Sequence, residues 1–463
     1  MEWVWRIVGL KLAVFYFFHA KRTNNLKLIS LSAEFWNKCI SSPIKILLMN
    51  LKFRLTIVNF LQFFIWGSYL TSLGGYMYVT LHFEGRQIGD VFLTLGIASI
   101  FMPAILGIVA DRFMNSERLL GLCHIAGAGL LYYTSTVGTP ATMFWAMLGV
   151  CMAYMPTISL NNAVSYHVLQ NNGMNPQKDF PPIRVWGTIG FICAMWITDL
   201  MHWTLSSTQL KFAAINALIT GLYCFTLPPC KPSISAGKKS LFSALGLDAF
   251  VLFKNSKMAI FFLFSMFLGA ALQITNQWGV SFLDHFKSTP AFADSFGVKY
   301  PNILVSISQI SETLFIITIP FFLRRFGIKK VMLMSMFAWV FRFALFGIGN
   351  PGPGLVFLVL SMIVYGMAFD FFNISGSLFV EKEAPPSMRG SAQGLFMMVT
   401  NGIGAMIGSY GSGWMIQRFT TGAVTDWSTI WYIFAGYALV VAVLFGIIFR
   451  YKHDPNAIGN VLH

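Results

Sequence analysis

The sequence predicts an all-α protein that crosses a membrane many times, and composition is the first reason. Of the 463 residues, 56% are hydrophobic and only 11% are charged, and the mean hydropathy is +0.66. A soluble chain carries roughly a quarter charged residues. In hydrocarbon every backbone polar group must be paired internally, so the spans are helices or closed barrels. The alternating strands of about ten residues that form a barrel are absent from this sequence, which leaves helices.

The basic character of the chain indicates orientation in a bilayer rather than nucleic-acid binding. The formal net charge is +15, but the lysines and arginines lie mainly in short connections between apolar runs. We therefore expect the lipid bilayer, and no nucleic acid, as a partner. The cysteines are scattered and have neither metal-ligand nor disulfide spacing, so we expect no metal site, and no cofactor is expected.

Residues Met1–Leu48 differ from the rest of the chain. The segment Trp3–Phe18 is apolar but interrupted by Arg6 and Lys11, and it lacks the cleavage site of a signal peptide. At Met49 a short basic head begins that runs directly into the first long apolar run, as is typical of the start of an inner-membrane protein. The hypothesis is that Met49 is the physiological initiator; the alternative is an extra membrane-surface or spanning segment in residues 1–48.

After Met49, apolar runs recur at the length that a helix needs to cross about 30 Å of hydrocarbon, about 20 residues. We predict about twelve spanning helices from these runs. They lie at 55–81, 88–110, 118–136, 141–165, 183–203, 209–228, 258–282, 302–323, 331–348, 354–379, 391–415 and 428–449.

Basic residues concentrate in alternate connections, which predicts that both termini face the cytoplasm. The longest such connection, 229–257, divides the spans six and six, and its stretch 240–250 has the pattern of an amphipathic surface helix. The predicted organisation is an N-terminal bundle at 49–228, this central loop, a C-terminal bundle at 258–450 and a cytoplasmic tail at 451–463. Two six-helix halves joined by a basic loop are typical of a major facilitator-type transporter, with substrate bound at the midplane between the halves.

The second apolar run ends in a motif that resembles the first part of the major facilitator signature. Its residues Gly107, Asp111 and Arg112 are candidates for gating, the glycine by permitting close contact between helices and Asp111 by pairing with charges and helix ends. The Gly-Arg-Arg that should follow is replaced by Phe113-Met114-Asn115. The alternative is that Arg112 is simply one of the basic residues that are common in cytoplasmic loops. The spacing Gly404-Ala-Met-Ile-Gly408 indicates close helix packing only.

Polar residues within the apolar runs are spaced so that they share helix faces. Amides, an arginine, aromatic rings and two carboxylates converging at mid-depth could bind a polar, uncharged solute that carries a ring. The candidates are Arg184, Thr188 and Phe191 at i, i+4 and i+7; Gln273 and Asn276; Gln309 and Glu312; and Tyr365, Phe369 and Asp370.

The two acids are the strongest candidates, because an ionised carboxylate in hydrocarbon costs at least ~2.5 kcal/mol and is functional by default. We expect Asp370, Glu312 or both to couple transport to protons. The other candidates have purely structural alternatives. Arg184 could extend to the membrane surface, and Gln273 and Asn276 could form hydrogen bonds between helices. We interpret Arg342 as a structural ion-pair partner and His124 as a packing histidine; the latter lies within the third apolar run.

From Met49 to about His453 the chain resembles the enterobacterial nucleoside:proton symporters of the major facilitator superfamily, the nucleoside and xanthosine permeases, and the nucleoside permease more than the other. The stretches that carry the resemblance are Phe101–Asp111, Asp179–Phe191, Leu245–Phe250, Leu272–Asn276, Ser306–Phe315, Ala368–Gly376 and Val380–Glu383.

The resemblance implies import of nucleosides with protons across the bacterial inner membrane. It also implies that the candidates from Arg184 to Phe369 line the nucleoside pocket and that Asp370 takes part in proton linkage. The mechanism expected is alternating access of the two halves, in a protein that we expect to be monomeric. The alternatives are a major facilitator transporter for xanthosine or another small polar solute, a passive channel or sensor, and a membrane-embedded enzyme. The last would need a nucleophile, a metal site or an acid–base pair at a loop–membrane boundary, and no such cluster occurs in the sequence.

Overall fold

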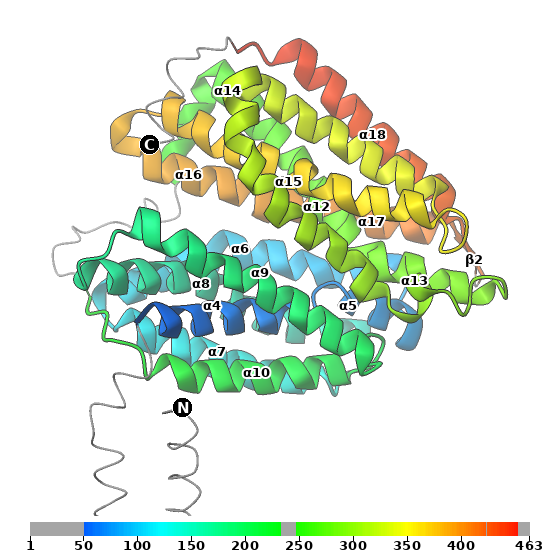
Figure 1. Ribbon diagram of the computed structural model, residues 1–463, viewed down its shortest axis with the longest axis horizontal. Helices are drawn as coiled ribbons and strands as arrows, with labels where there is room; N and C mark the ends of the chain where they lie inside the picture. Colours follow the sequence, from blue (N-terminus) through cyan, green and yellow to red (C-terminus); the bar gives the residue numbers. More distant parts are fainter. Residues whose placement is uncertain (1–50, 233–246, 423, 452–463) are drawn as a thin grey trace, which may run out of the picture. The chain divides into compact units, whose positions relative to one another are not determined.

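Helices make up nearly all of the secondary structure in the computed structural model, which describes residues 51–232, 247–422 and 424–451 (Figure 1). Two short strands, β1 (Thr420–Thr421) and β2 (Val424–Thr425), pair antiparallel. The prediction of an all-α chain is confirmed. The predicted extension 1–48, nearly all of the predicted tail 451–463 and most of the predicted surface helix 240–250 lie outside the described residues. In the described part of that connection, η2 (Leu247–Lys254) is a 3₁₀ helix.

The first half of the chain forms helices at each predicted apolar run. The first run is broken by turns at residues 68–72, so that α4 is followed by the short α5 and the π-helical η1. The elements are α4 (Leu51–Gly67), α5 (Leu73–Gly75), η1 (Tyr76–Thr80), α6 (Gly85–Arg112), α7 (Ser116–Thr134), α8 (Pro140–Asn171), α9 (Pro176–Leu200) and α10 (Thr208–Cys224).

The second half differs more from the predicted runs, because two of them form one helix. The runs 302–323 and 331–348 are joined in α14 (Pro301–Ile348), where Gly327 alone is non-helical, with φ 76° and ψ 167°. Glycine tolerates this backbone conformation because it has no Cβ. The other elements are α12 (Ser256–His285), η3 (Phe286–Ser288), α13 (Phe296–Lys299), α15 (Leu355–Glu383), η4 (Pro386–Met388), α16 (Arg389–Met397), the π-helical η5 (Met398–Gly404), α17 (Ala405–Arg418) and α18 (Trp427–Ile448).

Seven helices among the described residues are long and apolar enough to cross a membrane. One of the seven is α14, which holds two of the predicted spans, so the count of twelve stays a prediction. The seven are α6, α8, α9, α12 (extended to Ser288), α14, α15 and α18.

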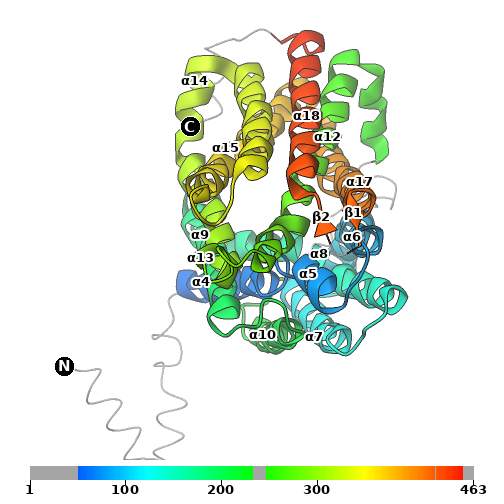
Figure 2. The ribbon, with the colours of Figure 1, turned by 90° about the vertical axis from the view of Figure 1, so that its right-hand side faces the viewer.

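Residues 58–463 form one unit, and all contacts described below lie within it. Helices α6 to α10 lie together, and α12, α14, α15, α17 and α18 lie together (Figure 1; Figure 2 shows the same from a second direction). The two groups meet where α6 packs on η5 and α17, where α9 packs on α14 and where α5 packs on α12.

Glycines permit these close approaches. A Cβ on Gly89 of α6 would lie 2.6 Å from the carbonyl oxygen of Ser409 on α17. The predicted packing role of Gly404 and Gly408 is confirmed, since a Cβ on either would collide with a carbonyl oxygen of α12, that of Met266 or Ala270.

Candidate functional site

Three charged side chains from three helices form one cluster. Arg184 of α9 interacts electrostatically with both Glu312 of α14 and Asp370 of α15, and the two acids interact with each other. The ion pairs within 4.0 Å among the described residues do not include Arg184 with either acid. The cluster therefore holds opposite charges near one another but leaves them out of direct contact.

Asp370 is the most enclosed of the three, with 4% of its surface exposed. Its Oδ2 atom is buried and has no hydrogen-bond partner among the described residues. A buried polar atom without a partner is costly, and an ionised one more so. A proton on this carboxyl, or a ligand that donates to it, would remove that cost. Glu312 is half-buried, so its side chain is more open to water.

Aromatic rings form a wall beside the acids. The rings of Tyr365 and Phe369, one turn apart on α15, are stacked with centroids 6.4 Å apart and planes at 11°. Gln309, one turn before Glu312 on α14, faces the Tyr365 hydroxyl group. Tyr365 also interacts electrostatically with Glu312 and Asp370. Thus Gln309, Glu312, Tyr365, Phe369 and Asp370, predicted from helical spacing, do lie together.

The Arg184 side chain packs against aromatic residues of the first half of the chain. Its guanidinium lies 3.9 Å from the centroid of the Phe63 ring, in a cation–π contact, and it interacts electrostatically with Tyr154. Further along the same helix, Thr188 is half-buried and Phe191 is buried edge-on against Trp66, with ring centroids 6.3 Å apart. The sequence analysis missed Phe63, Trp66 and Tyr154, because aromatic residues in an apolar run carry no signal of their own.

The two amides of α12, Gln273 and Asn276, are buried to different degrees. Leu272, which precedes Gln273, lines a small cavity together with Phe369. The Oε1 atom of Gln273 is buried without a partner, and Asn276 is half-buried. The structure records no contact between either amide and the charged cluster in its described residues, so the place of Gln273 and Asn276 in the substrate site stays a prediction.

The prediction that Arg342 is an ion-pair partner is wrong. It is 2% exposed, and no described carboxylate forms an ion pair with it. Instead its Nη1 donates to the Ser308 hydroxyl (3.2 Å) and the Ser361 carbonyl (3.0 Å). The guanidinium lies over the Tyr365 ring, so it does touch a residue of the proposed pocket. Neutral oxygens and ring faces take the place of the expected carboxylate.

His124 is a packing histidine, as predicted. It is buried, and its Nε2 lies 2.8 Å from the Gln62 side-chain oxygen. Gln62 in turn donates to the Thr157 hydroxyl at 2.7 Å, and its carbonyl accepts from the Tyr154 hydroxyl at 2.6 Å. This network ties α4, α7 and α8 together.

The predicted gating residues lie at the end of α6. Asp111 and Arg112 are exposed, and a Cβ on Gly107 would meet no atom within 4 Å. Among the described residues, the close contact expected at Gly107 is therefore not made. The other end of the same helix, at Gly85 and Gly89, is packed tightly against α17. The two groups of helices thus touch at one end of α6 and not at Gly107.

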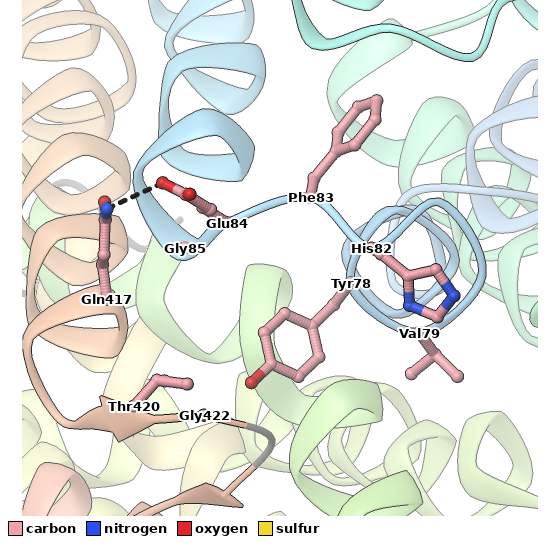
Figure 3. A pocket seen from close by; sticks show the side chains of 9 residues that line it. All are labelled: Tyr78, Val79, His82, Phe83, Glu84, Gly85, Gln417, Thr420 and Gly422. Carbon is pink, nitrogen blue, oxygen red and sulfur yellow. Dashed lines mark hydrogen bonds between the residues drawn. The ribbon is translucent and has the colours of Figure 1, made fainter.

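A cleft of about 620 Å³ opens where α6 begins (Figure 3). It is lined by Tyr78, His82 and Glu84 among others, and Glu84 accepts a hydrogen bond from Gln417 of α17 at 2.7 Å. No residue of the predicted substrate site lines it. This cleft is separate from the charged cluster.

Known proteins resemble this chain over nearly its whole described length. The family model described as "Nucleoside H+ symporter" matches residues 49–454. The xanthosine permease of Escherichia coli is 56% identical over 411 residues, 89% of this chain and 98% of that protein. The nucleoside permease NupG of Escherichia coli is 55% identical over 418 residues, 90% of this chain and 100% of that protein. The two identities do not separate the two permeases.

Solved structures of transporters have the same fold as this chain. The crystal structure of the nucleoside transporter NupG superposes with a TM-score of 0.83 at 55% identity and covers 87% of this chain and 100% of its own. A transporter of the POT family, PepTSo, superposes with a TM-score of 0.66 at 13% identity, which concerns the fold alone. The predicted major facilitator-type fold is confirmed, and so is the prediction of a transporter rather than an enzyme, since these relatives are permeases. This multi-pass membrane protein belongs to the nucleoside H+ symporter family.

Proposed function

We propose that this protein imports nucleosides together with protons across the bacterial inner membrane. The observation that carries the proposal is the cluster of Arg184, Glu312 and Asp370 beside the stacked rings of Tyr365 and Phe369, in a chain of this family. Its ring faces can stack on a ring-bearing solute, and its carboxylates can take up a proton. The relatives of this protein are nucleoside and xanthosine permeases.

The pocket residues fit the parts of a nucleoside. Ring faces of Phe191 and Phe369 stack on the base, because offset aromatic contacts are favourable. Amides, which both donate and accept hydrogen bonds, pair with base edges, and a carboxylate accepts from ribose hydroxyls. The residues that we assign to the pocket are Arg184, Thr188, Phe191, Gln273, Asn276, Gln309, Glu312, Tyr365 and Phe369.

Protons enter the cycle at Asp370, with Glu312 as its partner. Protonation from the periplasm neutralises a charge that is otherwise costly at this depth, and nucleoside then binds between the halves. Opening toward the cytoplasm releases both. The unpartnered Oδ2 of Asp370 supports this role, since it is an atom that a proton or a ligand would satisfy.

The two halves, 49–228 and 258–450, move relative to each other in this scheme. The tight contacts at Gly89, together with the exposed side chains of Asp111 and Arg112 near Gly107, support a state that is closed at the start of α6 and open at its end. With both termini in the cytoplasm, as the distribution of basic residues favours, this is the inward-facing state. In the other state we expect Gly107, Asp111 and Arg112 to close against the second half.

Uptake of radiolabelled nucleosides into cells that lack their own nucleoside transporters tests the function. Concentrative uptake that a proton uncoupler abolishes is expected, and uptake that persists unchanged would indicate a passive channel. Competition by unlabelled xanthosine separates a broad nucleoside transporter from one for xanthosine, a candidate because the xanthosine permease and NupG are almost equally similar to this chain. No accumulation of any nucleoside would overturn the proposal.

A further inference from the structure

A second buried carboxylate, far along α9 from Arg184, joins the two halves of the molecule. Asp199, in the last turn of α9, is 1% exposed. Its Oδ2 accepts a hydrogen bond of 2.7 Å from the backbone N–H of Ile303, in the first turn of α14. Its Oδ1 accepts a hydrogen bond from the Thr204 hydroxyl. A side chain of the first half thus holds the start of a helix of the second half.

The neighbour of Ile303 extends this connection. Asn302 is fully buried, and its amide nitrogen lies 3.3 Å from the Thr198 hydroxyl and 3.4 Å from the Thr204 hydroxyl. Its side-chain oxygen accepts a hydrogen bond of 2.9 Å from the Thr71 hydroxyl. Asn302 belongs to the second half, and its three partners belong to the first.

One turn further along α14 the two halves touch again. The Trp196 indole N–H donates to the Ser306 hydroxyl at 2.8 Å, and Ser306 is 1% exposed. Hydrogen bonds between α9 and α14 therefore cover the first two turns of α14. We call this set of residues the Asp199 contact; its members are Trp196, Thr198, Asp199 and Thr204 of the first half and Asn302, Ile303 and Ser306 of α14.

The charge of Asp199 is balanced by hydrogen-bond donors. The described ion pairs include no lysine, arginine or histidine with this carboxylate. A buried carboxylate is stable as an ion only when N–H and O–H groups point at it, and the exposed N–H groups at the start of a helix supply such donors. The site is thus complete only while α9 and α14 stay together. When they separate, water must replace the Ile303 N–H, while Thr204 stays beside Asp199 in the first half.

From these contacts we propose that Asp199 is a positioning residue for the transport cycle, which holds this end of the molecule closed and sets the balance between the two access states. It acts through α14, the helix that also carries Gln309 and Glu312. Glu312 lies nine residues after Ile303, about 13.5 Å along the helix axis. The inference goes beyond the transported solute and does not require that the solute be a nucleoside.

Thiol labelling of the purified, full-length protein tests this role. A cysteine at position 306 reports the Asp199 contact, because Ser306 is accessible only when α9 and α14 separate. A cysteine at position 107 reports the opposite end, where the structure has open space around Gly107. Rates of N-ethylmaleimide labelling are measured for Ser306→Cys and Gly107→Cys, each with and without Asp199→Asn, after subtraction of the labelling of the parent protein.

Asp199→Asn keeps one accepting oxygen for the Ile303 N–H but removes the charge of the carboxylate, so this hydrogen bond becomes a neutral and weaker one. We expect position 306 to be labelled about tenfold faster and position 107 more slowly, because losing a charge-assisted hydrogen bond shifts the population toward the other access state. Faster labelling at both positions would indicate general loosening and would overturn the proposal. Unchanged rates at both positions would overturn it as well.

Two further variants keep the test decisive. Thr204→Val removes one donor to Asp199 with little change in volume. We expect faster labelling at position 306 and slower labelling at position 107, both to a smaller extent than with Asp199→Asn. This variant tests the proposal if Asp199→Asn does not yield folded protein.

Glu117→Gln is the matched control. Glu117 is also a buried carboxylate that accepts a backbone N–H, that of Cys230 at 2.8 Å, but it does not reach the C-terminal half. A response to Glu117→Gln equal to that of Asp199→Asn would show that any buried carboxylate acts this way and would contradict the proposal.

Discussion

The guanidinium of Arg342 lies 4.4 Å from the centroid of the Tyr365 ring. A buried cation rarely lacks a carboxylate partner, but within the described part of the chain this one is held by a hydroxyl, a carbonyl and ring faces. It connects α14 to the ring that forms one wall of the proposed pocket.

Arg342→Met is expected to destabilise the protein and to weaken substrate binding. The variant removes two hydrogen bonds and the cation above Tyr365, which together amount to about 1–3 kcal/mol. Arg342→Lys keeps the charge but loses the planar group, so its stability and its KM should lie between those of the parent protein and those of Arg342→Met. Thermal unfolding in detergent and the KM for uptake measure these effects. A KM equal to that of the parent in Arg342→Met would contradict a link to the pocket.

Asp370→Asn is expected to abolish accumulation of nucleoside against its gradient while sparing binding and exchange. An amide cannot take up and release a proton at this site, so the driving force is lost but the pocket keeps its shape. Counterflow and concentrative uptake are compared in vesicles. Asp284→Asn is the control, because that carboxylate is paired with Lys287 at the end of α12. Full concentrative uptake by Asp370→Asn would remove Asp370 from the coupling role.

Glu312→Ala is expected to weaken binding itself. Loss of a charged hydrogen-bond acceptor for a ribose hydroxyl costs about 1.5–3 kcal/mol, or roughly 10- to 100-fold in Kd. Glu312→Gln should lose less, because its carbonyl still accepts a hydrogen bond. Isothermal titration of the purified variants with nucleoside measures the change. An affinity that matches the parent protein would count against the pocket assignment of Glu312.

Gly89→Val is expected to impair transport by forcing α6 and α17 apart. The first added carbon would lie 2.6 Å from the Ser409 carbonyl, and overpacking of this kind costs about 1–3 kcal/mol. Gly129→Val on α7 is the control, since a Cβ there meets nothing within 4 Å. The uptake rate per molecule of folded transporter is the measurement. Equal rates for the two variants would show that the contact at Gly89 is not needed.

The Cys230 thiol, which follows α10 outside the spans, is expected to resist alkylation at neutral pH. Burial, with a smaller contribution from the negative charge of Glu117, raises its pKa to about 12. Because the thiolate is the reactive form, labelling should stay slow up to about pH 9 and accelerate only toward the pKa. Mass spectrometry after N-ethylmaleimide treatment at several pH values measures this. Rapid labelling of Cys230 at pH 7 would contradict the burial of the thiol.

Sequence patterns predicted the helices well, because a bilayer imposes both their length and their composition. They predicted connections less well. Gly327 replaces a whole expected loop by one residue of unusual backbone conformation, which no hydropathy pattern records. They also missed the turns at residues 68–72 that interrupt the first apolar run.

For the candidate site, helical spacing grouped residues within α14 and within α15 but could not bring the two helices together. That step came from family resemblance. The partner of Arg342 was predicted wrongly, because the sequence does not show that ring faces and serine oxygens surround it. Asp199 was not singled out at all. It lies at the end of a run, where an acidic residue has the pattern of a membrane boundary, and its partner on α14, Ile303, is 104 residues away.

The uninterrupted helical path from Ile303 to Glu312 has a consequence for the phase of α14. Each residue of an α-helix advances by about 100°. One amino acid inserted between these two positions would leave Ile303 on Asp199 but turn the Glu312 carboxylate by more than a quarter of a revolution, away from Arg184. Three or four inserted residues would restore the angle and displace the acid by about one turn, so orientation and depth can be altered separately in this one segment.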